Sequence, residues 1–290
     1  MTQIPIFDTH QHMLMTDRWQ YSWTSGLGPL ENRRFDYATY LEAAAGTGIA
    51  GTLFMETTPD NPNWREETRC VLEMAADPAT MIRGVIANCR PEDEAGFEAW
   101  VESIHGPHLK GLRRILHVVP DEVSQQPVFV RNVQKLADWN LAFDLCFLAS
   151  QLPVALKLAK QCEDTQLVLD HCGVPDIAAG TIEPWREHIR ALSDLPNVAC
   201  KISGVLAYCA PNRCSIDSVR PYVEHCIECF GWDRVVWGGD WPVCLLTTDL
   251  KTWVETSREL VSGESEENQR KLFHKNAERI YRTTLEDART

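Results

Sequence analysis

The sequence lacks any apolar run near the ~20 residues that a membrane-spanning helix needs. It also lacks a basic segment followed by an apolar one at its start, so we expect no signal peptide. Basic residues are few, with 28 Lys and Arg against 41 Asp and Glu, and the net charge is −13. This charge argues against nucleic acid and anionic membrane as partners. We therefore expect a cytoplasmic protein with neither of these partners.

No Gly-, Ser- or Pro-rich linker divides the chain, so we interpret residues 1–290 as one domain. The 11 cysteines are an odd number and form no short-loop framework, which favours a reducing compartment over disulfides. Cys226 and Cys229 form one CxxC motif after His225, but no second CxxC accompanies it. Because the motif lies in a predicted helix, we interpret it as packing rather than as a metal site.

What the chain does have is a regular alternation of short apolar segments with helical patterns. The predicted strands are Ile4–His10, Gly51–Thr57, Ile82–Cys89, Leu109–Ile115, Ala142–Phe147, Gln166–His171, Val198–Gly204 and Arg234–Asp240. The predicted helices are Tyr37–Ala45, Arg65–Ala76, Glu92–Ile104, Pro127–Trp139, Leu152–Cys162, Pro184–Leu192, Ser218–Cys229, Leu250–Leu260 and Glu266–Tyr281. Strands that are apolar on both faces and separated by helices indicate a covered parallel sheet. Eight such repeats predict an α/β protein with a single (β/α)8 TIM barrel.

The segment from Met13 to Phe35 is the longest one without clear periodicity, and it carries Trp19, Tyr21 and Trp23. It follows the first predicted strand, on the side where loops build the active sites of barrels. Two interpretations stay open. The segment forms part of a lid, or it is an ordered surface loop whose aromatic side chains are buried by packing.

Imidazole and carboxylate side chains recur where the predicted strands end, which is where barrels carry their reactive groups. His10 and His12 are two residues apart on a strand and so project from the same face. His171 ends the sixth predicted strand and Asp240 ends the eighth. A pair of histidines at one strand end can be two unrelated polar residues, but this convergence favours a common site.

Three imidazoles and one carboxylate suit a single divalent metal ion, with zinc the first choice. The predicted ligands are His10, His12, His171 and Asp240. The imidazoles can alternatively bind a carbonyl oxygen directly, without a metal ion. In either arrangement Asp240 can act as general base toward a water molecule.

Further polar side chains at the same end of the barrel are candidates for binding substrate. Glu56 ends the second predicted strand, Arg113 ends the fourth, and His117 lies just beyond it. A guanidinium supplies several fixed donors for a carboxylate or a hydroxyl. A structural ion pair is an equal alternative for Arg113. For Lys201, in the middle of the seventh strand, an internal salt bridge is favoured over a catalytic role.

Several local strings together resemble the amidohydrolase superfamily, in its branch of sugar-lactone and 2-pyrone-4,6-dicarboxylate lactonases. The strings are Phe7-Asp8-Thr9-His10-Gln11-His12, Gly111-Leu112-Arg113-Arg114, Leu169-Asp170-His171-Cys172-Gly173-Val174-Pro175, Cys200-Lys201-Ile202-Ser203-Gly204 and Trp237-Gly238-Gly239-Asp240-Trp241-Pro242-Val243. The resemblance spans nearly the whole chain. It implies a hydrolase that opens lactones, with a metal ion that can be dispensable.

The chain departs from the metal-rich members of that superfamily, which carry a histidine on strand five. The fifth predicted strand, Ala142–Phe147, has none, so a binuclear site is not expected. If a second ion were bound, Asp144 and Cys146 would be the first ligands to consider.

The predicted reaction is attack of water on a lactone carbonyl, which opens the ring to a hydroxy acid. We predict a polyhydroxylated sugar lactone rather than a dicarboxylate lactone. Glu56 would repel a second carboxylate, and Arg113 and Arg114 are the only clustered cations at the predicted mouth. Two rivals remain, a metal-dependent decarboxylase of aromatic acids and a barrel that binds a sugar acid without turnover. The particular lactone and the oligomeric state stay open, a homo-oligomer included.

Overall fold

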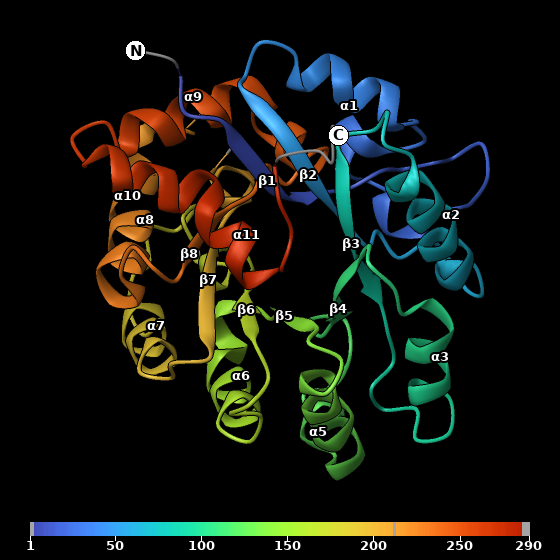
Figure 1. The fold of residues 1–290 in the computed structure, drawn as a ribbon. Helices are drawn as coiled ribbons and strands as arrows, with labels where there is room; N and C mark the ends of the chain where they lie inside the picture. Colours follow the sequence, from blue (N-terminus) through green and yellow to red (C-terminus); the bar gives the residue numbers. More distant parts are fainter. Residues whose placement is uncertain (1–2, 211–212, 286–290) are drawn as a thin grey trace.

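The computed structural model describes residues 3–210 and 213–285. Its eight strands form one sheet in which neighbours follow the order of the chain, and each consecutive pair is parallel (Figure 1). The strands are β1 (Ile6–Gln11), β2 (Ile49–Met55), β3 (Ile82–Asn88), β4 (Leu109–Ile115), β5 (Ala142–Cys146), β6 (Leu167–Leu169), β7 (Val198–Ile202) and β8 (Val235–Trp237). A parallel bridge between Gln11 and Trp241 joins the last strand region to the first. The predicted (β/α)8 barrel is thus confirmed.

Helices surround the strands on the outside of the barrel (Figure 1). They are α1 (Tyr37–Ala44), α2 (Trp64–Ala76), α3 (Phe97–Ile104), α4 (Glu122–Gln125), α5 (Pro127–Gln134), α6 (Leu152–Ala159), α7 (Trp185–Ser193), α8 (Ile216–Phe230), α9 (Leu250–Leu260), α10 (Glu266–Arg270) and α11 (Asn276–Ile280). Ser215 caps α8 in a capping box with Ser218. The helix predicted from Glu266 is interrupted by a π turn at Lys271–Lys275.

The barrel interior is layered. One buried apolar layer comes from the strands and consists of Phe7, Leu53, Met55, Ile86, Ala142, Val168, Ala199 and Val236. Ala277, Ile280 and Tyr281 from the end of the chain join this cluster and close the amino-terminal end of the barrel. Since side chains two apart share a face, the next inward residues of β5 and β7 are Asp144 and Lys201. A charged layer therefore lies directly above an apolar one.

A break in the register of β1 determines where its histidines point. Asp8 pairs with Thr52 and Gln11 with Phe54, so β1 has one residue more than β2 over this stretch. Strict alternation from the inward Phe7 would place His10 on the outer face. The bulge shifts the phase by one residue, and His10 enters the interior.

Two predicted strands end earlier than the sequence indicates. β6 ends at Leu169 and β8 at Trp237, so His171 and Asp240 lie in the turns that follow. Both residues have positive φ, +54° and +53°, which is outside the extended conformation of a strand. These turns carry His171 and Asp240 over the end of the barrel.

The segment from Met13 to Phe35 fits the interpretation of an ordered packed loop, and its role as a lid stays a prediction. Trp19 and Tyr21 are buried, as expected for an ordered packed loop. Trp23 stays 39% exposed, and its indole nitrogen donates to the carbonyl of Thr57 at 2.9 Å. This contact holds the indole at the carboxyl end of the barrel.

Candidate active site

A cavity of about 320 Å³ opens at the carboxyl ends of the strands. Its walls come from or after every strand except β3. They are His12, Trp23, Thr57, Thr58, Arg113, Ile115, His117, Val118, Cys146, Leu148, His171, Val174, Tyr208, Asp240 and Val243. This is the end of the barrel at which the sequence places the reactive groups.

Asp240 lies among the three predicted histidines at the floor of the cavity. Its Oδ1 is 3.5 Å from Nε2 of His12 and 3.7 Å from Nε2 of His10, and its Oδ2 is 4.0 Å from Nδ1 of His171. Oδ2 is buried and has no hydrogen-bond partner among the described residues. A Cβ on Gly204 would come within 2.6 Å of both Oδ2 and Nδ1 of His171, so only glycine leaves room for this arrangement.

The imidazoles of His12 and His171 are each oriented by one hydrogen bond. Nδ1 of His12 lies 2.9 Å from the carbonyl oxygen of Met55. Because a carbonyl only accepts, Nδ1 of His12 donates to it, and Nε2 faces Asp240. Nδ1 of His171 lies 2.9 Å from the hydroxyl of Ser203. Burial lowers the pKa of His171, so its ring is neutral near pH 7.

His10 lies between two cations. Nη1 of Arg113 is 3.3 Å from its Nε2, and Nζ of Lys201 is 3.3 Å from its Nδ1. Burial lowers the pKa of His10 well below its ordinary value, and Lys201 adds to this, although Asp170 opposes the shift. We conclude that His10 is neutral and that both of its nitrogens already face polar partners.

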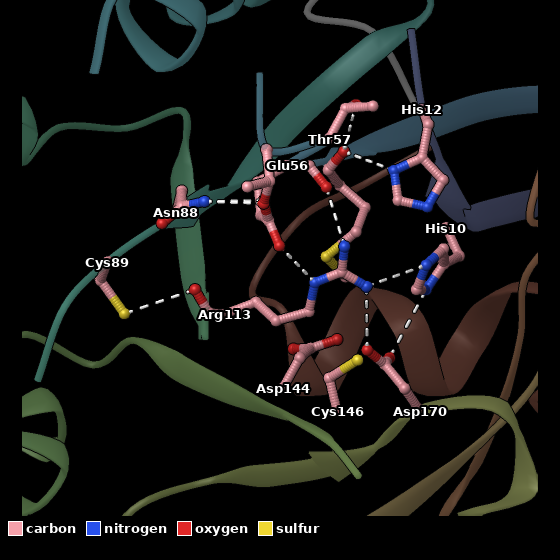
Figure 2. Close-up of polar contacts among 12 residues, drawn as sticks. His10, His12, Glu56, Thr57, Asn88, Cys89, Arg113, Asp144, Cys146 and Asp170 are labelled. Atoms are coloured by element: carbon pink, nitrogen blue, oxygen red, sulfur yellow. Dashed lines mark hydrogen bonds and ion pairs between the residues drawn. The ribbon is translucent and has the colours of Figure 1, made fainter. Parts of the chain in front are cut away.

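Arg113 is the centre of a buried ion-pair network (Figure 2). Its Nε lies 2.8 Å from Oε1 of Glu56, its Nη2 donates to the Glu56 carbonyl at 2.8 Å, and its Nη1 lies 3.2 Å from Oδ2 of Asp170. The other carboxylate oxygen of Glu56 accepts from Thr58 and, at 2.9 Å, from Asn88. Burial alone would raise the pKa of Glu56, but the Arg113 charge and these hydrogen bonds hold it below its usual value.

The network gives Glu56 a partner within the protein. Its side chain is fully buried and lies outside the lining of the cavity. In this arrangement it positions Arg113, and its predicted contact with a substrate stays a prediction. Arg113 does line the cavity, but its donors are already engaged. The sequence could not reveal this, because the two residues are 57 positions apart.

A second buried ion-pair group lies beneath the first. Nζ of Lys201 pairs with Oδ2 of Asp144 and, at 3.0 Å, with Oδ1 of Asp170. The hydroxyl of Tyr281 donates to Asp144 at 2.9 Å. Burial raises the pKa of Asp144 to about 7, although Lys201 opposes the shift. The predicted internal salt bridge of Lys201 is confirmed, and the residue does not line the cavity.

The other basic residues considered from the sequence, His117 and Arg114, lie in different places. His117 lines the cavity as expected, and its Nδ1 is 3.5 Å from Sγ of Cys146. Burial and the Arg113 charge lower the pKa of His117 to about 4, so the ring is neutral. Arg114 instead pairs with Glu92 at 2.9 Å and is not part of the lining. The expected cluster of Arg113 and Arg114 at the mouth is wrong, because adjacent strand residues point to opposite faces.

Two residues at the floor received no role from the sequence. Asp170 joins Arg113, Lys201 and His10, and these partners hold its pKa well below the usual value even though burial alone would raise it. A signal for Asp170 was available, since it follows the inward Val168 by two residues. Tyr208 also lines the cavity, but it lies in a 3₁₀ turn after β7 that shows no periodicity.

Two groups at the floor could hold a metal ion. One is His10, His12 and Asp240, the other is His10, Asp170 and His171, and within each group the donor atoms lie within 4.8 Å of one another. The unpartnered Oδ2 of Asp240 and the free Nε2 of His12 fit such an ion. Arg113 competes for Nε2 of His10 and adds positive charge beside the site.

A third group with donors this close is Cys172, Cys200 and Cys226. It is buried in the core, and it includes one cysteine of the CxxC motif. Cys229, the other cysteine of the motif, lies 3.4 Å from Nε2 of His225. The interpretation of this motif as packing stays a prediction.

The amidohydrolase family model matches residues 7–283. The chain belongs to the amidohydrolase family, and the expected enzyme of this family is confirmed. An L-fucono-1,5-lactonase of Burkholderia ambifaria is 28% identical, over 82% of this chain and 81% of the relative. A solved amidohydrolase from Burkholderia multivorans with bound zinc has a TM-score of 0.87 at 22% identity, covering 97% of this chain and all of that one.

The same fold also carries a different named activity. The solved 5-carboxyvanillate decarboxylase of Sphingomonas paucimobilis has a TM-score of 0.70 at 17% identity, covering 97% of this chain and all of that one. At this identity the likeness concerns the fold alone. Within the part of the chain that the structure describes, no helix has the length and apolar character needed to cross a membrane.

Proposed function

We propose that the protein hydrolyses a lactone to the corresponding hydroxy acid, with Asp240 as the general base. The observation that carries the proposal is the buried Oδ2 of Asp240, which has no hydrogen-bond partner among the described residues and belongs to a residue lining the cavity. A carboxylate oxygen in this position can accept a proton from water.

In the proposed reaction a water molecule lies between Asp240 and the lactone carbonyl. Its oxygen forms a bond to the carbonyl carbon while one of its protons passes to Asp240. The ring C–O bond then breaks, and the alkoxide that leaves takes the proton from Asp240. The guanidinium of Arg113 lines the same cavity, and its charge supports the negative charge that develops on the carbonyl oxygen.

The charge balance of the site favours a neutral substrate. Arg113 is the one Arg or Lys among the lining residues, and it is shared between Glu56 and Asp170. A dicarboxylate would meet no uncommitted cation there. The named substrate of the Burkholderia ambifaria relative makes a sugar lactone the first class to test.

A divalent ion, zinc first, would be held by His10, His12 and Asp240 with His171 nearby, and it would supply a Lewis acid for the carbonyl. Neutral His171 fits this role. Arg113, 3.3 Å from Nε2 of His10, acts against it by charge repulsion. We therefore propose at most one ion and an activity that does not depend on it.

The test is a panel of lactones followed with a pH indicator, beside a panel of hydroxybenzoates followed by carbon dioxide release. We expect acid release from lactones and no carbon dioxide. Carbon dioxide release without lactone turnover would establish the decarboxylase instead. Tight binding of a sugar acid with neither reaction would establish a binding protein.

A further inference from the structure

The rim of the cavity is unusually apolar for a surface in contact with water. Four large apolar side chains are exposed among the described residues: Trp23 at 39%, Val118 at 67%, Leu148 at 39% and Leu41 at 38%. The first three line the cavity. Leu41 instead lies in α1 and lines a different pocket. Most of the exposed large apolar side chains of the described residues therefore lie at the mouth of the cavity, where a substrate would enter.

The apolar character continues from the rim into the walls. Ile115, Val174 and Val243 line the cavity between the rim and the floor. Polar groups also line the cavity, but several of them are already engaged within the protein. Thr58 donates to Glu56, and His117 lies against Cys146. A ring hydroxyl directed toward the rim would lose its water and find few partners, which costs free energy.

We infer that the preferred substrate is a lactone whose ring carries an apolar substituent, alkyl or aryl, directed from the floor to the rim formed by Trp23, Val118 and Leu148. The inference rests on the proposed lactone hydrolysis and specifies its substrate class. The reacting carbonyl lies against Asp240 at the floor. The substituent covers the three exposed side chains and removes apolar area from water on both partners.

This class differs from the polyhydroxylated lactone predicted from the sequence. That prediction assigned Glu56 and Arg113 to ring hydroxyls, whereas the two side chains bind each other. With them engaged, the cavity keeps little capacity to recognise several hydroxyls. The volume of about 320 Å³ is near the lower limit for small-molecule sites and accommodates a ring with one substituent.

The first experiment compares kcat/KM along a series that shares one ring: δ-valerolactone without a substituent, δ-hexalactone with a methyl group and δ-decalactone with a pentyl chain. D-galactono-lactone and L-fucono-1,5-lactone are the hydroxylated comparisons. We expect kcat/KM to rise about two- to fourfold for each methylene that is buried. Both hydroxylated lactones should be slower than δ-decalactone.

The second experiment changes the rim at nearly constant size. Val118→Thr and Leu148→Asn, combined in one chain, should lower the ratio of kcat/KM for δ-decalactone to that for δ-valerolactone by about tenfold. Leu41→Asn is the matched control, with similar exposure outside the cavity, and should leave the ratio unchanged.

The outcomes separate this inference from the function on which it rests. Hydrolysis of sugar lactones in preference to δ-decalactone would overturn the inference and leave lactone hydrolysis standing. An unchanged ratio in the Val118→Thr/Leu148→Asn chain would also overturn it. Absence of turnover with every lactone would overturn both.

Discussion

The floor and the rim of the cavity differ in almost every physical respect. At the floor, buried charges form ion pairs, and Arg113 pairs with both Glu56 and Asp170. At the rim, Val118 and Leu148 are exposed, apolar and without charged partners in the lining. The floor therefore has a fixed arrangement before any substrate binds, whereas the rim gains its stabilisation only when something covers it.

This difference separates chemistry from selectivity. A preorganised charged floor can stabilise a developing oxyanion for any lactone that reaches it. An apolar rim contributes in proportion to the apolar area of the substrate. Changes at the floor should thus lower the rates for all lactones together, while changes at the rim should alter their ratios.

The largest effect is expected for Asp240→Asn at the floor. The change keeps the size of the side chain but removes its basicity, and asparagine tolerates the positive φ of this position. We expect kcat to fall about a thousandfold with every lactone, while the substrate ratios and the denaturation midpoint stay near those of the parent protein. A variant with near-normal turnover would remove Asp240 from the mechanism.

The second largest effect is expected for Lys201→Met. This variant tests whether the ion pairs beneath the floor stabilise the floor. Without the lysine, Asp144 and Asp170 face each other with no cation between them. The free energy of unfolding should fall by about 3–5 kcal/mol in urea denaturation. Arg220→Met, which breaks an exposed pair with Glu224 in α8, is the control and should cost less than about 1 kcal/mol. Similar losses for both variants would contradict this account.

Gly204→Ala should have a smaller but selective effect on the floor. The added Cβ would lie 2.6 Å from Asp240 and from His171, so both side chains must shift. We expect kcat to fall about tenfold, with substrate ratios unchanged. The same substitution at Gly180, which also has positive φ but open space around it, controls for backbone strain alone. Equal loss of activity in the two variants would show that crowding of the floor is not the cause.

Acid should destabilise the protein through the buried histidines of the floor. The pKa values of His10 and His171 are lowered in the folded state, so below their ordinary value of 6.5 the unfolded chain binds more protons. The free energy of unfolding should fall with decreasing pH from about 6.5, by at most about 1.4 kcal/mol per pH unit for each histidine. The raised pKa values of Asp144, to about 7, and of buried Glu67 act in the opposite direction, whereas the pKa of His117, lowered to about 4, adds to the fall. Urea titrations at about pH 7.5 and about pH 5.5 measure the difference, and equal stabilities would contradict the prediction.

Removal of metal should have the smallest effect. Because Arg113 lies against Nε2 of His10, we expect less than about twofold loss of kcat after exhaustive chelation. Elemental analysis of the same sample gives the metal content. A complete loss that zinc restores would show that the ion displaces Arg113 and takes part in the reaction.

Much of the floor was predictable from the sequence, because strand ends in a barrel converge on one side. That rule places His12, His171 and Asp240 together. It places His10 there only because a bulge shifts the phase of β1, and no residue type in Phe7-Asp8-Thr9-His10 indicates the bulge. Asp170 follows from the two-residue period of β6.

The rim and the pairing of charges were not predictable in this way. Val118 and Leu148 lie in loops, where no periodicity relates sequence to direction. Arg113 finds Glu56 rather than a substrate because of side-chain geometry across neighbouring strands, which spacing along the chain does not encode.

Lactone hydrolysis is tested most directly by turnover in water labelled with heavy oxygen, using the best lactone of the panel and mass analysis of the product. Attack on the carbonyl predicts one labelled oxygen, located in the carboxylate, and an unlabelled hydroxyl group. A label in the hydroxyl group, or a product without label, would contradict the account.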